Sequence, residues 1–89
     1  MYFVYMMFFE SLDVYYKGST SNIQERFLNH LNGKSKYTSK TNDWELVFIR
    51  EFSTKSEALK NEKMLKRQHR KYLTWAILQD YNIIKSFTF

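Results

Sequence analysis

The chain has 89 residues, of which 44% are hydrophobic and 19% aromatic, so one small domain over residues 1–89 is expected. It has no cysteine, which excludes a disulfide framework and a thiolate zinc site and fits a reducing cytoplasm. The net charge of +5 and the pI of about 9.5 favour a polyanionic partner.

The first nine residues, MYFVYMMFF, are apolar. They are far shorter than the ~20 residues that span a bilayer. They also lack the basic region and the cleavage site of a signal peptide. Their aromatic and methionine content instead predicts a strand over Tyr2–Phe9 that is buried on both faces.

A hairpin is expected next, with a turn over Glu10–Asp13 and a second strand over Val14–Ser19. If Phe9 pairs with Val14, the alternation of side chains places four residues on one face of the sheet: Tyr5, Met7, Tyr16 and Gly18.

Ser21 and Gln24 have capping-box spacing, which predicts a helix over 23–32 that Gly33 ends. Its core stripe recurs at every fourth residue: Ile23, Phe27 and Leu31. A polar loop over 33–43, with a helical turn near Ser39, should follow.

A third strand is predicted over Trp44–Phe52, with Leu46, Phe48 and Arg50 alternating against Val47, Ile49 and Glu51.

Thr54 and Glu57 form a second capping box, which predicts a long helix from Lys55 to about Arg70. A shorter helix or helical extension should cover 71–80. The tail over 81–89 is predicted either to add an edge strand or to cover the core. The fold class is therefore α+β, a three-stranded antiparallel sheet flanked by helices in the order ββαβαα.

Glu62 is the most informative single residue, because it falls within the apolar stripe that Ala58, Leu59 and Leu65 define on the long helix. A carboxylate that faces a core must be paired or bound to a metal ion. The alternative to a metal ligand is a half-buried salt bridge to a neighbouring lysine or arginine.

Arg26 and His30 lie one turn apart on the first helix, where a guanidinium and an imidazole suit a phosphodiester. Alternatively, Arg26 pairs with Glu25 or Glu51, and His30 is a partly buried residue with its own partner. These two residues, the sheet tyrosines and Glu62 would converge only if both helices pack near the same face of the sheet. Together they would form a plausible phosphodiesterase site.

Basic residues are concentrated between Lys60 and Lys71, opposed only by Glu62. Such a cluster is either a solvated helix face or a contact with a polyanion. The residues expected to contact nucleic acid are Lys34, Lys36, Lys63, Lys66, Arg67 and Arg70.

The order and spacing of several short motifs resemble the GIY-YIG endonuclease family over about residues 2–78. The segments that carry the resemblance are Phe3-Val4-Tyr5, Tyr16-Lys17-Gly18, Ser19-Thr20, Arg26-Phe27-Leu28-Asn29-His30, Gly33-Lys34 with Tyr37-Thr38, Trp44-Glu45-Leu46-Val47, and Ala58 with Glu62 and Lys66. The chain is most similar to small stand-alone members related to the nuclease domain of the bacterial excision-repair endonuclease.

The resemblance implies that Glu62 holds one Mg²⁺ or Mn²⁺ and that the substrate is DNA. Tyr5 would be the general base, and Tyr16 and His30 would position water and phosphate or assist proton transfer. Arg26 would stabilise charge on the phosphoryl oxygens.

The chain departs from the family pattern at three positions. Phe3 replaces a glycine, Lys17 replaces an isoleucine, and Thr74 stands near the place of an asparagine. The function that the resemblance implies is a structure-selective DNA endonuclease linked to repair or processing. Two alternatives remain: a nucleic-acid-binding module with weak or lost catalysis, and a nuclease subunit that needs a targeting partner, which would dock on exposed hydrophobic residues between positions 72 and 89.

Overall fold

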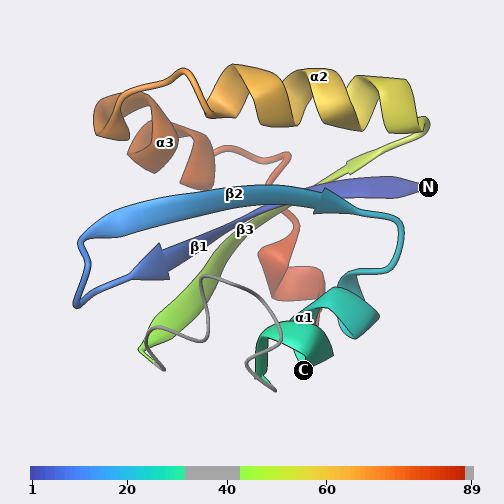
Figure 1. The fold of residues 1–89 in the computed structure, drawn as a ribbon. Helices are drawn as coiled ribbons and strands as arrows, with labels where there is room; N and C mark the ends of the chain where they lie inside the picture. The colour runs from blue at the N-terminus through green and yellow to red at the C-terminus, as the bar shows by residue number, and fades with distance from the viewer. Residues whose placement is uncertain (32–42, 88–89) are drawn as a thin grey trace.

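The computed structural model describes residues 1–31 and 43–87. Its three strands form one antiparallel sheet in the order β2-β1-β3 (Figure 1). The strands are β1 (Tyr2–Phe9), β2 (Val14–Thr20) and β3 (Trp44–Phe52). The predicted Gly33 helix stop, the turn near Ser39 and the side chain of Leu31 lie outside the described part of the chain.

Strand β1 lies at the centre of the sheet and is buried on both faces, as predicted. Val4 and Met6 are buried on one face, and Tyr5, Met7 and Phe9 are buried on the other. This alternation places two hydrophobic clusters on opposite sides of a single strand.

The predicted hairpin register is confirmed. Phe9 pairs with Val14 and Tyr5 pairs with Gly18. The turn ends at Asp13, whose φ of 52° lies in the left-handed region that aspartate tolerates better than most residues.

Helices cover both faces of the sheet, which gives three layers (Figure 1). On the Met6 face lie α2 (Lys55–Leu65) and α3 (Arg70–Ile77). On the Tyr5 face lie α1 (Ile23–Leu31) and the short 3₁₀ helix η1 (Ile84–Ser86). The order ββαβαα is confirmed, but α1 and α2 pack on opposite faces, so the stated condition that both helices lie near the same face is not met.

The two helix starts differ in how well the sequence predicted them. Thr54 caps α2 by accepting a hydrogen bond from the Glu57 amide at 3.2 Å, as predicted. In α1, Asn22 Oδ1 accepts from the Glu25 amide at 3.1 Å, so the cap is Asn22 and not Ser21.

Helix α2 ends at Leu65, five residues before the predicted end near Arg70. The amides of Arg67 and Gln68 bond to carbonyls three residues earlier, at 3.0 and 3.1 Å, which tightens the chain into a turn. His69 is then extended, with φ −77° and ψ 162°. Because of this break, α3 turns back and buries Leu73 beside Leu65 in the same cluster.

A β-bulge interrupts the pairing of β1 with β3. Met6 pairs with Phe48 but Met7 pairs with Leu46, which leaves Val47 as the extra residue. Leu46 therefore packs on the Tyr5 face while Phe48 packs on the Met6 face. The prediction that these two residues share a face is wrong, because the bulge shifts the alternation by one residue.

The described part of the tail covers the core, which decides between the two predicted alternatives. The Ile83 amide donates to the Ile49 carbonyl at 2.8 Å, and Ile83, Ile84 and Phe87 pack against the cluster on the Tyr5 face. Within the described residues, none of the helices is long and apolar enough to cross a bilayer.

Candidate active site

The Tyr5 ring of β1 lies directly over Gly18 of the neighbouring strand β2. A Cβ atom built on Gly18 would lie 2.6 Å from the Tyr5 hydroxyl oxygen and 2.7 Å from Cζ, closer than real Cβ contacts allow. Glycine at position 18 therefore lets the phenol cross the outer strand toward α1.

The Tyr5 hydroxyl meets both polar residues of α1. Arg26 Nε donates a hydrogen bond to it at 2.9 Å, and His30 Nε2 lies 3.2 Å from it. The Tyr16 ring lies 6.2 Å from the Tyr5 ring and 5.9 Å from the His30 ring, measured between centroids. The four residues predicted from the hairpin and the first helix are therefore adjacent. Arg26 bonds to Tyr5, not to the alternative partners Glu25 and Glu51.

Burial controls the protonation of this group. Burial raises the pKa of Tyr5 to about 12, against the opposing effect of the Arg26 hydrogen bond. Burial, with the positive charge of Arg26, lowers the pKa of His30 to about 4. At neutral pH the phenol is therefore protonated and the imidazole is neutral.

The neutral imidazole has two tautomers, so the hydrogen bond between Tyr5 and His30 has two possible directions. The Tyr5 oxygen accepts from Arg26, which never deprotonates, and the phenol donates to His30 Nε2 in the tautomer where that nitrogen carries no proton. In that tautomer the imidazole proton lies on Nδ1, an atom that is buried and has no hydrogen-bond partner within the described residues.

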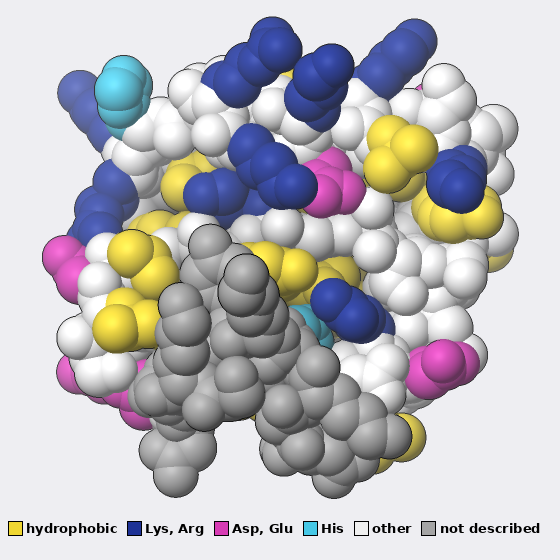
Figure 2. Space-filling view, in the orientation of Figure 1, with side chains coloured by type: hydrophobic (Ala, Val, Ile, Leu, Met, Phe, Trp, Pro, Cys, Tyr) yellow, Lys and Arg dark blue, Asp and Glu magenta, His cyan; other side chains and the backbone are white. Residues whose placement is uncertain are grey.

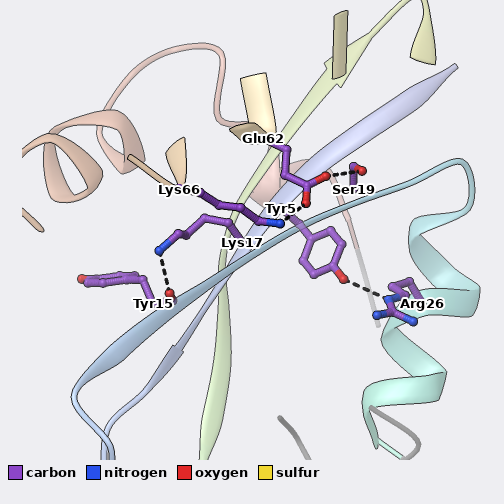
Figure 3. A network of polar contacts seen from close by, with 7 residues as sticks. All are labelled: Tyr5, Tyr15, Lys17, Ser19, Arg26, Glu62 and Lys66. Atoms are coloured by element: carbon purple, nitrogen blue, oxygen red, sulfur yellow. Dashed lines mark hydrogen bonds and ion pairs between the residues drawn. The ribbon is translucent and has the colours of Figure 1, made fainter. Parts of the chain in front are cut away.

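Glu62 of α2 contacts strand β2 from the other face of the sheet. Its side chain is 14% exposed, so it is turned inward. Ser19 Oγ donates to its Oε1 at 2.5 Å, and Lys66 Nζ lies 2.8 Å from its Oε2 (Figure 3). The half-buried salt bridge considered as an alternative thus forms, but on a carboxylate that also contacts the hairpin.

The apolar stripe around Glu62 is only partly as predicted. Ala58 and Leu65 are buried, whereas Leu59 is 46% exposed and faces away from the core. The prediction for Leu59 is wrong, because α2 contacts the sheet along a stripe too narrow to include position 59.

The cluster around the Tyr5 hydroxyl and the Glu62 carboxylate therefore lie on either side of strand β2. Figure 3 shows Glu62 with Ser19 on one side of this strand and Tyr5 with Arg26 on the other. Gly18, which lies under the Tyr5 ring, and Ser19, which bonds to the Glu62 carboxylate, are consecutive residues of β2. An open polar cleft of about 250 Å³ adjoins both groups, lined by Ser19, Thr20, Ser21, Asn22, Glu25, Arg26 and Asn29.

Glu62 suits a Mg²⁺ ion that keeps most of its water ligands. Within the described residues, no group of three or more histidines and carboxylates is placed to hold a metal ion. Mg²⁺ commonly binds through one or two carboxylates plus water and phosphate oxygens. The Lys66 ammonium shows that Oε2 already accepts a cation, and the Lys66 side chain is 55% exposed.

Basic side chains surround this carboxylate. Figure 2 shows Lys and Arg side chains across the top of the molecule, over α2. Lys63, Lys66 and Arg67 are exposed, as a phosphate contact requires. Arg70 is bound to Asp13, with Nη1 2.6 Å from Oδ1, and Lys34 and Lys36 lie outside the described residues.

Ser19, Lys17 and Thr74 had no predicted role in the site. Ser19 was part of a matched motif, but sequence alone gave no sign of its bond to Glu62. Lys17 donates to the Tyr15 carbonyl at 2.9 Å, and burial together with the charge of Lys66 lowers its pKa. Thr74 bonds to carbonyls of its own helix at 3.0 and 3.1 Å, so its hydroxyl is committed to backbone.

Residues 1–77 match the GIY-YIG catalytic domain family. The chain is 40% identical over 58 residues to UPF0213 protein YazA of Bacillus subtilis, covering 64% of this chain and 59% of YazA. It is 43% identical over 56 residues to UPF0213 protein H16_B0156 of Cupriavidus necator, covering 62% and 61%. The chain thus spans about 60% of the length of these curated relatives.

A solved structure shows the same fold. The solution NMR structure of UPF0213 protein BH0048 from Bacillus halodurans has a TM-score of 0.58 and 26% sequence identity, over 91% of this chain and 87% of that one. The family match covers the hairpin, α1 and α2, which hold every described residue of the candidate site. The chain therefore belongs to the GIY-YIG catalytic domain family.

Proposed function

We propose that this protein is a Mg²⁺- or Mn²⁺-dependent DNA endonuclease. The observation that carries the proposal is the pair of groups flanking β2: the Tyr5 hydroxyl bonded to Arg26 beside His30, and the half-buried Glu62 bonded to Ser19. Family membership supports a nuclease, and the net charge of +5 supports a polyanionic substrate.

Arg26 is proposed to bind the scissile phosphate. Its Nε bonds to Tyr5, which holds the guanidinium at the polar cleft, where we expect it to meet phosphoryl oxygens. Because the guanidinium is held in place before the substrate binds, it can stabilise the charge that develops on those oxygens.

Tyr5 and His30 are proposed to relay a proton. A phenol with a pKa of about 12 is not ionised at neutral pH, so Tyr5 is a poor base by itself. The phenol oxygen can take a proton from the attacking water as its own proton passes to His30 Nε2. Bound phosphate would favour the resulting imidazolium, and Tyr16 would help to position the water.

Glu62 would hold the metal ion, which when bound supplies Lewis-acid stabilisation of the phosphate and of the leaving oxygen. Ser19 fixes the carboxylate by its hydrogen bond to Oε1. We further propose that the enzyme is related to the nuclease domain of the bacterial excision-repair endonuclease, selects DNA by structure and acts in repair or processing.

Cleavage of supercoiled plasmid and branched DNA tests the proposal. Wild-type protein should nick DNA with Mg²⁺ or Mn²⁺, and Glu62→Gln should abolish nicking. Glu51→Gln, an exposed carboxylate on β3, is the matched control and should cleave normally. Equal cleavage by Glu62→Gln and wild type would contradict the proposal.

Arg26 variants separate catalysis from binding. Arg26→Ala should lose most of the cleavage rate but bind DNA only modestly less well. Arg26→Lys should also be slow, because it keeps the positive charge but loses the planar set of N–H donors. If rate and affinity fall equally, Arg26 is only a phosphate anchor.

A second candidate is a DNA-binding module with little catalysis, which the raised pKa of Tyr5 favours. In that case clean protein would bind DNA but fail to cut it at any Mg²⁺ or Mn²⁺ concentration. Activity that appears only in a co-purified complex would instead indicate a subunit that needs a targeting partner.

A further inference from the structure

We propose that α3 carries a stacking surface for an unpaired nucleobase, formed by Trp75 and Tyr72. The inference rests on the proposed function and adds to it the feature of the DNA that would be selected. Neither residue contributes to the site around β2, so the surface is a second point of contact.

The two rings form an exposed aromatic surface. Trp75 is 50% exposed, and its ring centroid lies 5.3 Å from that of Tyr72, with 43° between the ring planes. They line an open, largely apolar depression of about 390 Å³, together with Gln68, His69 and Lys71.

The core does not account for Trp75. Helix α3 packs against the sheet through Leu73 and Ala76, which are 3% and 1% exposed. Half of the largest side chain of the helix therefore faces solvent, where its apolar surface gains nothing from folding. Exposed aromatic side chains in such positions are frequent at binding surfaces.

The charge around this surface favours a polyanion as the occupant. Between Glu62 and Asp80 the chain has no acidic residue, but it has Lys63, Lys66, Arg67, Arg70 and Lys71. Lys71 lines the depression itself, and Arg67 is exposed on the preceding turn. Aromatic rings flanked by lysine and arginine are the combination that binds single-stranded nucleic acid through its bases and phosphates.

Arg70 holds the surface in place relative to the hairpin. Its guanidinium bonds to the Asp13 carboxylate at 2.6 Å and to the Asp13 carbonyl at 2.5 Å, and it lies 5.7 Å from the centre of the Tyr15 ring. Nucleic acid on α3 is thereby positioned relative to β2, the strand that the candidate active site flanks.

An unpaired base is the part of DNA that suits this surface. In a duplex both faces of every internal base are covered by its neighbours, so an aromatic ring cannot stack on it. A base in a single-stranded tail or at a branch point has a free face. The surface would therefore select DNA that has unpaired nucleotides near the cut.

Trp75 fluorescence provides a direct test without metal and without cleavage. The chain has two tryptophans, so Trp44→Phe leaves Trp75 as the only one. Oligothymidylate should quench Trp75 at low salt, while a blunt duplex of equal length should quench it much less. Equal quenching by both would overturn the proposal.

Binding by variants tests whether the ring itself matters. Trp75→Leu keeps an apolar side chain but cannot stack, and should weaken oligothymidylate binding by about tenfold, from the ~1–3 kcal/mol of one stacked base. Trp75→Phe should retain most of the affinity. Leu78→Ser, an 81% exposed position on the next turn, is the control and should bind like wild type.

Two further outcomes are decisive. If Trp75→Leu and Leu78→Ser leave DNA binding intact but both abolish self-association in ultracentrifugation, the surface docks protein and the proposal fails. If oligothymidylate quenches Trp75 but no DNA is cut, the stacking surface stands and the nuclease proposal fails. Glu62→Gln should leave quenching unchanged.

Discussion

Ser19 Oγ donates a 2.5 Å hydrogen bond to Glu62 Oε1 and thereby joins strand β2 to helix α2. The two residues are 43 positions apart in the sequence. A hydrogen bond to an ionised carboxylate is stronger than one between neutral groups. The bond therefore holds one oxygen of Glu62 in place, while the other oxygen contacts Lys66.

Removing the Ser19 hydroxyl should loosen this carboxylate. We expect Ser19→Ala to bind Mn²⁺ about threefold to tenfold more weakly, since one charge-assisted bond contributes ~1.5–3 kcal/mol, part of which water replaces. Electron paramagnetic resonance of free Mn²⁺ measures this directly. Ser19→Thr keeps the hydroxyl and should bind normally. Unchanged affinity in Ser19→Ala would show that the bond does not position Glu62.

Lys66 should compete with the metal ion for Glu62. Its ammonium lies 2.8 Å from Oε2, so Lys66→Met should tighten Mn²⁺ binding by about threefold to tenfold, as expected from removing one charge near a divalent ion in a solvated site. Lys17→Met is the control, because it removes a nearby charge that repels Lys66 but has no direct contact with Glu62. Equal effects of the two variants would mean that general charge, not the ion pair, controls metal binding.

Gly18→Ala should displace the Tyr5 ring. The new Cβ would lie 2.6 Å from the phenol oxygen, so either the ring or the strand must move. Overpacking of this kind costs about 1–3 kcal/mol of unfolding free energy. We expect a loss of that size in urea denaturation and a larger loss of cleavage rate, because the contacts with Arg26 and His30 are broken. Full activity with normal stability would show that the ring position is unimportant.

His30 should make the protein less stable in acid. Its pKa is about 4 in the folded protein against 6.5 unfolded, so the unfolded chain binds more protons between these values. The free energy of unfolding should therefore fall as the pH drops from 6.5 to 4, by up to about 3 kcal/mol from this residue. In urea denaturation at several pH values, His30→Gln should show a shallower fall than wild type. His69→Gln, at an exposed position, should behave like wild type.

Asn82 should be a major contributor to stability. Its Oδ1 accepts from the amides of Ile49 and Ile84, each at 3.1 Å, and its Nδ2 donates to the carbonyls of Val47 and Ile77 at 3.1 and 2.9 Å. Asn82→Ala leaves these backbone groups unpaired, which should cost about 2–4 kcal/mol in urea denaturation. Asn82→Asp should also destabilise, because it loses both donors. A cost under about 1 kcal/mol would mean that water replaces the amide.

The first strand was predictable from sequence because its apolar residues follow one another without a break, as burial on both faces of a sheet requires. In β1, Val4 and Tyr5 face different clusters and both are buried. Shifting the hairpin register by one residue would therefore expose no face of this strand, but it would move Gly18 away from its position under the Tyr5 ring. The pairing of an aromatic residue with glycine therefore helps to specify the register.

Other features left no local signal. No glycine or proline marks the end of α2 at Leu65, and the bulge at Val47 lies in an apolar run where either face is acceptable. Ser21 and Asn22 are both good caps, so the sequence pattern could not choose between them. The bonds of Ser19 and Asn82 depend on how distant elements pack, which spacing alone does not reveal.

The arrangement of the site also differs from the expectation. Tyr5 and Glu62 come from opposite faces of the sheet, and they approach each other only because β2 is its outer strand. In the middle of a sheet, flanking strands would separate the two groups completely. The position of β2 at the edge of the sheet, and not the residue types, allows Tyr5 and Glu62 to lie against the same strand.

This placement has a consequence for self-assembly. Outer strands are prone to recruit another chain edge to edge. A neighbour that hydrogen-bonded alongside β2 in the described sheet would lie across the polar cleft between Ser19 and Arg26. Oligomers built through that edge would cover the proposed phosphodiester site, so polymerisation through it and the proposed cleavage would exclude one another.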